Sequence, residues 1–275
     1  MSDLTGKTIL ITGAGNGIGQ QTALELARMH ARLLLHDKSL QHLDKTCDLI
    51  RSGTGSANLA LYPADFSSLA EVKAIANEVI THEKHLDVLV NNAGIYVPKP
   101  TLSADGFELS FAVNHLAHFL LTLLLLKKIK QSTPARIVVV ASSVHSAHDI
   151  DYDFLHTLDG YEGWEAYSQS KLANVLFTYY LADYLKDSGV TANCLHPGVV
   201  DTYLLRSAWP DLQGISVQAG AATSVFLASS PDVEGVTSKY FSEQKPISSH
   251  QITYNKKTQE RLWKFSMQIV EKYYE

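Results

Sequence analysis

Four short segments of this 275-residue chain are apolar almost throughout, and they constrain its fold more than any other feature. They are TILIT, RLLLH, DVLVN and RIVVVAS, which begin at Thr8, Arg32, Asp87 and Arg136. A strand that is apolar along its whole length is buried on both faces, whereas a strand with one face in water alternates apolar and polar residues. We therefore expect a parallel sheet with helices covering both of its faces.

Longer stretches with helical periodicity separate these strands and three further candidates, so strands and helices alternate along the chain. The expected strands, about seven, are 8–12, 32–36, 57–62, 88–91, 136–141, 191–195 and 239–241. The expected helices are 17–31, 40–51, 69–82, 107–130, 164–186, 217–229 and 257–273. This alternation predicts an α/β fold with a doubly wound, mostly parallel sheet of the Rossmann type. No linker divides the sequence, so we expect a single domain over residues 1–275.

Bulk charge and cysteine content exclude several classes of function. The formal net charge of -5 and the pI of about 6.2 leave no basic surplus for a nucleic acid. The two cysteines have no partner at metal or redox spacing, and the twelve histidines form no HExxH motif, so we expect no metal. The chain start lacks a signal-peptide pattern, and the longest apolar run, 116–126, is too short to cross a bilayer. We expect a cytoplasmic protein without a transmembrane anchor.

The segment TGAGNGIG, residues 12–19, lies between the first expected strand and the first expected helix. Its glycines permit a tight turn and a close approach of the main chain to a pyrophosphate, and the helix N-terminus adds amide donors and a positive dipole. Glycines also form ordinary loops, so the position between strand and helix is what supports this prediction. The residues expected to bind a dinucleotide here are Gly13, Gly15, Asn16, Gly17, Ile18 and Gly19.

Asp37 follows the second expected strand, 24 residues after Gly13. A carboxylate there can accept hydrogen bonds from the adenosine ribose and repel a 2′-phosphate, which favours NAD over NADP. Lys38 leaves NADP open, because a cation at this point could bind that phosphate. The alternative for both residues is an ordinary surface turn.

Small and polar residues also end the third and fourth expected strands. Asp65 and Phe66 come after the third strand, where Asp65 can meet an adenine or can instead cap the next helix. Asn92, Ala93 and Gly94 come after the fourth, where small side chains let a cofactor lie against the sheet. We expect all five residues to bind the cofactor.

Tyr167 and Lys171 are four residues apart in a predicted helix, and no other tyrosine has a lysine at this spacing. The spacing places both side chains on one helix face, and a nearby cation lowers the pKa of a phenol. Such a tyrosine could exchange a proton near neutral pH. A pair at this spacing also arises by chance and is then usually solvated, so the prediction depends on the rest of the chain.

Six motifs occur in one order and together resemble the short-chain dehydrogenase/reductase family across essentially the whole chain. They are TGAGNGIG, NNAG, the Asn114 of FAVNHLAHFLLT, the serines at 142 and 143, YSQSK and HPGVV. The resemblance implies a catalytic tetrad of Asn114, Ser143, Tyr167 and Lys171. Ser143 is preferred over Ser142 because the family's catalytic serine is normally the later one. The resemblance also implies cofactor contacts from Tyr167, Lys171, Pro197, Gly198, Val200 and Thr202.

The implied reaction needs a hydride source and a proton donor that acts on the same oxygen. Tyr167 would exchange the proton, and Ser143 would hold the substrate oxygen by a hydrogen bond. Lys171 would bind the nicotinamide ribose and lower the pKa of Tyr167. Asn114 would tie a water to Lys171, or would simply be a satisfied buried amide. The cofactor half is then about 1–135, and the catalytic and substrate half about 136–275.

A narrower likeness points to retinol-dehydrogenase-like members of the family. It rests on the insertion DIDYDFLHTLDGYEGW, on SKLANVLF after the tyrosine, and on RLWKFSMQIV near the C-terminus. The residues expected around the substrate are mostly apolar, which favours a lipophilic alcohol or carbonyl compound. They are Val144, His145, residues 149–164, Tyr203, Leu204, Leu205 and Trp209. The apolar segment 116–126 and the face VLFTYYLADYL, residues 175–185 of the Tyr167 helix, could contact a partner. Because family members often dimerise through these two helices, we also expect a homodimer.

Two other classes of protein compete with an NAD(P)-dependent dehydrogenase. An epimerase or dehydratase of the longer sister branch usually has TGxxGxxG and a larger C-terminal region, and this sequence has neither. A regulatory or scaffold protein could use the same fold to sense NAD(H) without turnover. Such proteins commonly lose a tetrad residue, and none is lost here.

Overall fold

The computed structural model describes residues 2–274 and contains one eight-stranded sheet in the order β3-β2-β1-β4-β5-β6-β7-β8. Neighbouring strands are parallel as far as β7, and β8 pairs antiparallel with β7. The bounds are β1 (Thr8–Thr12), β2 (Arg32–Asp37), β3 (Leu59–Pro63), β4 (Val88–Asn91), β5 (Ala135–Val140), β6 (Val190–His196), β7 (Tyr240–Ser242) and β8 (Lys245–Ile247). The predicted doubly wound sheet is confirmed, with one strand more than expected.

The extra strand is β8, whose three residues are all exposed and include a proline. The turn that joins it to β7 consists of Glu243 and Gln244, with φ of 49° and 62°. Two residues with positive φ are typical of a tight hairpin, but Asn-Gly is the usual sequence for such a turn. Neither the strand nor its turn therefore gave the signal that would have predicted it.

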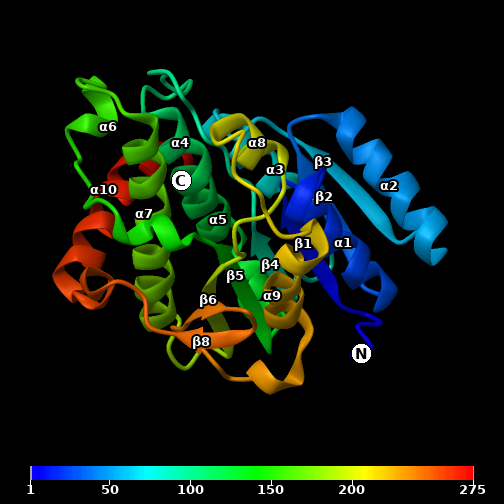
Figure 1. The fold of residues 1–275 in the computed structure, drawn as a ribbon. Coiled ribbons are helices and arrows are strands. Elements are labelled where there is room, and N and C mark those ends of the chain that lie inside the picture. The colour runs from blue at the N-terminus through cyan, green and yellow to red at the C-terminus, as the bar shows by residue number, and fades with distance from the viewer. Residues whose placement is uncertain (1, 275) are drawn as a thin grey trace.

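Helices cover both faces of the sheet (Figure 1) and enclose a separate apolar core on each. One face is covered by α1 (Gly17–Arg28), α2 (Leu40–Thr54) and α9 (Val217–Ser229). The other is covered by α3 (Leu69–His82), α5 (Ala117–Gln131) and α7 (Gly163–Tyr184). Alternate residues of β1 belong to different cores, since Leu10 faces the second group while Ile9 and Ile11 face the first. This confirms that the apolar strands are buried on both faces.

The helix expected over 107–130 is not uniform. It consists of α4 (Leu109–Phe111), a π-helical turn η1 (Ala112–Leu116) and α5. The whole stretch Leu109–Gln131 is long and apolar enough to cross a membrane, which corrects the shorter apolar run read from the sequence. In this structure 89% of its most apolar window is buried inside the protein, as in the core helix of a folded domain.

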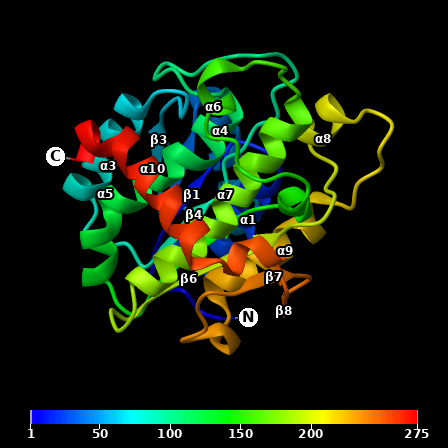
Figure 2. The same cartoon turned by 90° about the vertical axis from the view of Figure 1, so that its left-hand side faces the viewer.

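The C-terminal helix α10 (Lys256–Tyr274) lies across α5 and α7 (Figure 2). Its Trp263 stacks on Tyr180 of α7 at 4.5 Å between ring centroids and meets Phe119 of α5 edge-on at 4.9 Å. His115, at the start of this layer, is hydrogen-bonded to Ser266 of α10 at 2.9 Å. Part of the outer apolar face of α5 and α7 is therefore covered by the chain's own helix, and the homodimer across these two helices stays a prediction.

Candidate active site

A cavity of about 730 Å³ opens at the carboxyl ends of the parallel strands. Eighteen of the nineteen predicted cofactor-binding residues line it. They are Gly13, Asn16, Gly17, Ile18, Gly19, Asp37, Lys38, Asp65, Phe66, Asn92, Ala93, Gly94, Tyr167, Lys171, Pro197, Gly198, Val200 and Thr202. Gly15 lies behind Asp37, and of the predicted catalytic residues only Asn114 lies outside the lining.

The glycine turn has no room for side chains at three of its positions. A Cβ added to Gly19 would lie 2.1 Å from the Gly13 carbonyl oxygen, because α1 packs directly on the end of β1. A Cβ added to Gly15 would lie 2.7 Å from the Asp37 carboxylate, which explains why Gly15 does not reach the cavity. Gly13 and Gly17 have φ of 65° and 53°, a conformation that favours glycine. At these glycines no side chain lies between the main chain and the cavity, and this fits a bound pyrophosphate.

Asp37 ends β2 at the cavity wall with its carboxylate largely buried, 12% exposed. Its two oxygens accept hydrogen bonds from the main-chain N–H groups of Gly15 at 3.3 Å and Ser39 at 3.0 Å. Each carboxylate oxygen retains a lone pair, so the group can also accept from a ribose hydroxyl. Lys38 lines the cavity too, so both residues of the expected discriminating pair lie at the site.

His36 is a buried contributor to the cofactor end that sequence reasoning missed. Its Nδ1 accepts from the Gly13 N–H at 3.4 Å, and its Nε2 lies 3.1 Å from the Ala64 carbonyl oxygen, to which it donates. Burial lowers its pKa to about 4, so the imidazole is neutral and ties the glycine turn to the loop after β3. An apolar strand that ends in histidine was the only signal for this role.

The ends of β3 and β4 are fixed by short polar contacts. Asp65 accepts from the Ser67 N–H at 2.8 Å, and Ser68 rather than Asp65 caps α3. The alternative that Asp65 is the helix cap is therefore wrong. At the end of β4, the Thr12 hydroxyl accepts from the N–H groups of Asn92 at 2.8 Å and Ala93 at 2.9 Å. These contacts hold the strand ends at one edge of the sheet.

Tyr167 and Lys171 are both buried on one face of α7, with Nζ 5.6 Å from the centre of the phenol ring. The ammonium donates to the Val140 carbonyl oxygen at 3.2 Å. Burial raises the pKa of Tyr167 to about 12 and lowers that of Lys171 to about 8. The expected lowering of the tyrosine pKa by the lysine is therefore not seen, because loss of solvation raises the pKa and the group that lowers it is Ser142.

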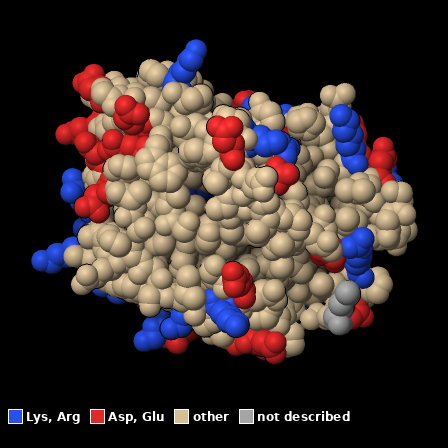
Figure 3. Space-filling model, viewed as in Figure 1, with Lys and Arg blue, Asp and Glu red and all other residues tan. Residues whose placement is uncertain are grey.

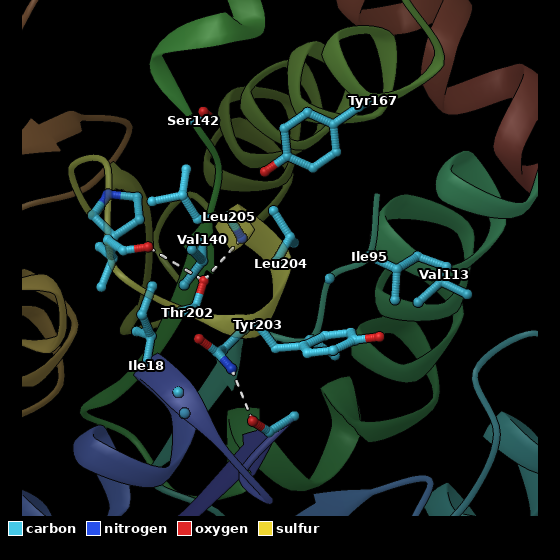
Figure 4. Close-up of a pocket in the computed structure, with 18 of the residues that line it drawn as sticks. Ile18, Ile95, Val113, Val140, Ser142, Tyr167, Thr202, Tyr203, Leu204 and Leu205 are labelled. Carbon is cyan, nitrogen blue, oxygen red and sulfur yellow. Dashed lines mark hydrogen bonds between the residues drawn. The ribbon is translucent and has the colours of Figure 1, made fainter. Parts of the chain in front are cut away.

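The serine that hydrogen-bonds Tyr167 is Ser142, although Ser143, the serine preferred from the sequence, also lines the cavity. A side-chain hydrogen bond with Ser142 lowers the pKa of Tyr167 and partly offsets the effect of burial. Figure 4 shows the Tyr167 hydroxyl pointing to the side of the cavity on which Ser142 lies. Ser143 is exposed and begins a 3-10 turn, η2 (Ser143–Ser146). The two serines are adjacent where β5 has ended and no helix has begun, so no periodicity distinguishes them in the sequence.

Asn114 lies in the π-helical turn, fully buried behind the cavity wall. Its Nδ2 donates to the Ile95 carbonyl oxygen at 3.0 Å and to Ser170 Oγ at 2.9 Å, and its Oδ1 accepts from the Ile95 N–H at 2.8 Å. Both amide hydrogens are thus used by the protein, in line with the satisfied-amide alternative. A Cβ added to Gly94 would lie 3.3 Å from Lys171 Nζ and 3.5 Å from Asn114 Oδ1, so both polar atoms border the same glycine.

The substrate side of the cavity is apolar and aromatic. The residues there are Ile95, Leu102, Leu109, Val113, Val144, Trp164, Tyr203, Leu204, Leu205, Trp209 and Leu212. Several come from α8 (Tyr203–Ala208) and the segment after it, and Trp209 lies 6.4 Å from Tyr167 and 5.4 Å from Trp164 between ring centroids. Figure 3 shows a broad area without Lys, Arg, Asp or Glu on this side of the molecule.

Two expectations about the substrate side are wrong. Of the insertion 149–164 only Trp164 lines the cavity, because Phe154 and Leu155 of α6 (Phe154–Thr157) are buried in the core and the Leu155 carbonyl accepts from the Glu108 N–H. His145 also lies outside the lining and packs against Tyr240, with the ring centroids 4.8 Å apart. Among the described residues no group of three or more His, Cys, Asp or Glu could hold a metal ion.

The family model and two similar curated proteins indicate the same family for this chain. The model of the short chain dehydrogenase family matches residues 7–213. Human retinol dehydrogenase 14 is 38% identical over 96% of this chain and 86% of its own length. Mouse retinol dehydrogenase 12 is 39% identical over 97% of this chain and 87% of its own length.

Solved structures agree with this result. An uncharacterised protein from Mycobacterium paratuberculosis superposes with a TM-score of 0.81 and 29% identity, over 98% of this chain and 96% of the other. A short chain dehydrogenase from Shigella flexneri, solved in complex with NADP, gives a TM-score of 0.72 and 25% identity. That alignment covers 89% of this chain and all of the other, 100%.

Proposed function

The chain belongs to the short chain dehydrogenase family, in its retinol-dehydrogenase-like branch, and from that premise we propose that it moves hydride between a nicotinamide cofactor and a lipophilic alcohol or carbonyl compound. The observation that supports this most is the convergence of Tyr167, Ser142 and Lys171 on the cavity that the glycine turn also lines. When bound, the nicotinamide would supply or accept the hydride.

Each side chain has a defined task in the proposed reaction. Tyr167 exchanges a proton with the substrate oxygen, and the Ser142 hydroxyl stabilises the charge that develops on that oxygen. Because burial raises the pKa of Tyr167 to about 12, the protein alone keeps the phenol protonated, which is the form that donates to a carbonyl. Lys171 would hold the nicotinamide ribose, and Asn114 keeps the loop at Ile95 in place beside α7.

We propose NAD as the preferred cofactor. The Asp37 carboxylate lies at the cavity wall with a free lone pair on each oxygen, which suits a ribose diol and repels a 2′-phosphate. Lys38 is also in the lining and opposes this preference. The NADP bound by the Shigella flexneri relative keeps NADP as the second candidate.

The apolar lining supports a lipophilic substrate, and the retinol dehydrogenases among the relatives act on a compound of that kind. The second candidate function is an NAD(H)-binding regulatory or scaffold protein. The intact and converging side chains at the site favour turnover over sensing alone.

The test compares NADH and NADPH oxidation with a panel of aldehydes, ketones and retinoids for the native chain and Tyr167→Phe. We expect turnover with the native chain, loss of at least about 1000-fold in kcat with Tyr167→Phe, and unchanged cofactor affinity. Tyr180→Phe, on the same helix but packed against Trp263, is the control and should retain native turnover. Tight cofactor binding without any turnover that depends on Tyr167 would instead establish the sensor.

A further inference from the structure

One peptide bond at the site, between Ser142 and Ser143, has both of its polar groups bound by histidine side chains. The Ser142 carbonyl oxygen lies 2.6 Å from His145 Nδ1, and the Ser143 N–H donates to His196 Nδ1 at 3.1 Å. The two histidines belong to different elements, because His145 is in the 3-10 turn η2 and His196 ends β6. Local sequence alone therefore does not bring them together.

The hydrogen bonds fix the protonation of the first imidazole. Because a carbonyl oxygen only accepts, His145 Nδ1 must carry a hydrogen and donate it. Its Nε2 accepts from the main-chain N–H of His250 at 3.0 Å, so it must carry none. Burial lowers the pKa of His145, which favours this neutral form. The His145 ring also packs against the ring of Tyr240, which restricts its orientation.

The second imidazole has the opposite role. His196 Nδ1 accepts from a main-chain donor and must be unprotonated, which leaves the hydrogen on Nε2. Burial lowers the pKa of His196, and the neighbouring His145 lowers it further. One histidine thus donates to the peptide and the other accepts from it, and neither can exchange roles without losing its hydrogen bond.

We propose that His145 and His196 are positioning residues that clamp the Ser142–Ser143 peptide and thereby direct the Ser142 hydroxyl at Tyr167. The inference rests on the proposed function. Rotation of this peptide would change ψ of Ser142 and φ of Ser143 together, and so would change the direction of the Ser142 side chain relative to Tyr167. The clamp accounts for the extended conformation of Ser142, with φ -161° and ψ 159°, and for the exposed position of Ser143.

The test uses two matched pairs of substitutions. Asn carries a polar atom at the position of His Nδ1, and Leu has the same branched shape without one. The side chain of His145→Asn can still donate to the Ser142 carbonyl, and that of His196→Asn can still accept from the Ser143 N–H. The side chains of His145→Leu and His196→Leu cannot, and in His145→Leu the carbonyl keeps only the weaker bond from the main-chain N–H of residue 145, 3.3 Å in the native protein. We expect each Leu variant to lose about 100-fold in kcat, as when a catalytic group is displaced by about 1 Å, with KM and cofactor affinity within threefold of native.

The Asn variants should recover kcat to within about tenfold of native, which a purely structural role for the histidines would not produce. Native kcat in both Leu variants, or an equal loss in the Leu and Asn variants, would overturn the clamp. Amide hydrogen exchange measured at Ser143 gives a reading that does not depend on turnover. Slow exchange in the native chain and fast exchange in His196→Leu are expected, and fast exchange in the native chain would overturn the clamp.

These readings separate the two proposals. If the native chain shows no turnover that depends on Tyr167, the proposed function fails, and the Ser143 exchange rates still decide whether the peptide is clamped. If turnover depends on Tyr167 and the Leu variants are unaffected, the clamp fails and the proposed function stands.

Discussion

The cofactor end and the catalytic end of this molecule are built from different kinds of atoms. At the cofactor end, glycines and main-chain groups form the wall, and the turn that begins at Gly13 follows β1 directly in the chain. At the catalytic end, side chains from β5 and its following turn, from α7 and from the π-helical turn must meet at one point. The first depends on local sequence, and the second depends on how distant segments pack.

This difference explains where the sequence was sufficient. A binding site made of main-chain N–H groups can be predicted even when a motif is placed one residue off, because neighbouring residues supply similar N–H groups. A site that depends on one hydroxyl beside one phenol cannot be predicted with such an error, because Ser142 and Ser143 are adjacent in the chain. Substitutions at the two ends should therefore have different effects on cofactor binding, turnover and stability.

The largest effect is expected at the cofactor end. Gly19→Ala should weaken cofactor binding by about 1000-fold or more, about 4 kcal/mol, because the new Cβ would lie 2.1 Å from the Gly13 carbonyl oxygen. Fluorescence titration with NADH measures this. Gly53→Ala is the control, since its Cβ would make only an ordinary contact at 3.5 Å with Leu24. Native affinity in Gly19→Ala would contradict the close packing of α1 on β1.

At the catalytic end a substitution should raise stability while it removes activity. Lys171 is buried with its pKa lowered to about 8 from 10.5, so its charged form destabilises the folded state. Lys171→Met should abolish turnover and raise the free energy of unfolding at pH 7 by about 2 kcal/mol, since the lost hydrogen bond to Val140 offsets part of the gain. Urea unfolding measures the change.

The buried Lys171 should also make the stability of the folded protein depend on pH. Between pH 8 and about 10 the unfolded chain holds more protons at Lys171 than the folded protein does, so native stability should rise with pH in this window. Below pH 8 the full cost of the charge is present. In Lys171→Met this rise should be absent, and an identical pH profile in both proteins would show that Lys171 is not buried as described.

The smallest effect concerns cofactor choice. Asp37→Asn removes the charge that repels a 2′-phosphate and leaves Lys38, so the ratio of kcat/KM for NADPH to that for NADH should rise about tenfold, about 1.4 kcal/mol. Asp44→Asn makes the same change of charge on the exposed side of α2 and should leave the ratio unchanged. An unchanged ratio in Asp37→Asn would show that this carboxylate does not discriminate.

Much of the fold was predictable because burial on both faces leaves a direct trace in sequence. The strands from β1 to β7 and most of the helices on both faces lie close to their expected ranges. What could not be predicted depends on contacts between distant segments. Trp263 packs on Phe119 and Tyr180, and nothing near Trp263 in the chain indicates where it packs.

The same limit applies at the site. The glycine turn, Asp37 and the Tyr167–Lys171 pair were predictable because each is set by its spacing within one or two elements. His36 and His196 were not singled out as hydrogen-bonding groups, because their partners belong to other elements. The raised pKa of Tyr167 was also missed, because a sequence shows the nearby lysine but not the loss of solvent around both groups.

The most direct test of this account is the kcat of Ser142→Ala and Ser143→Ala, measured side by side at saturating cofactor. Ser142 hydrogen-bonds the Tyr167 phenol and Ser143 is exposed, so under the proposed function only the first substitution should remove a hydrogen bond to the substrate oxygen. We predict a loss of about 100- to 1000-fold for Ser142→Ala and a change of less than about threefold for Ser143→Ala. The reverse order of the two losses would contradict the account.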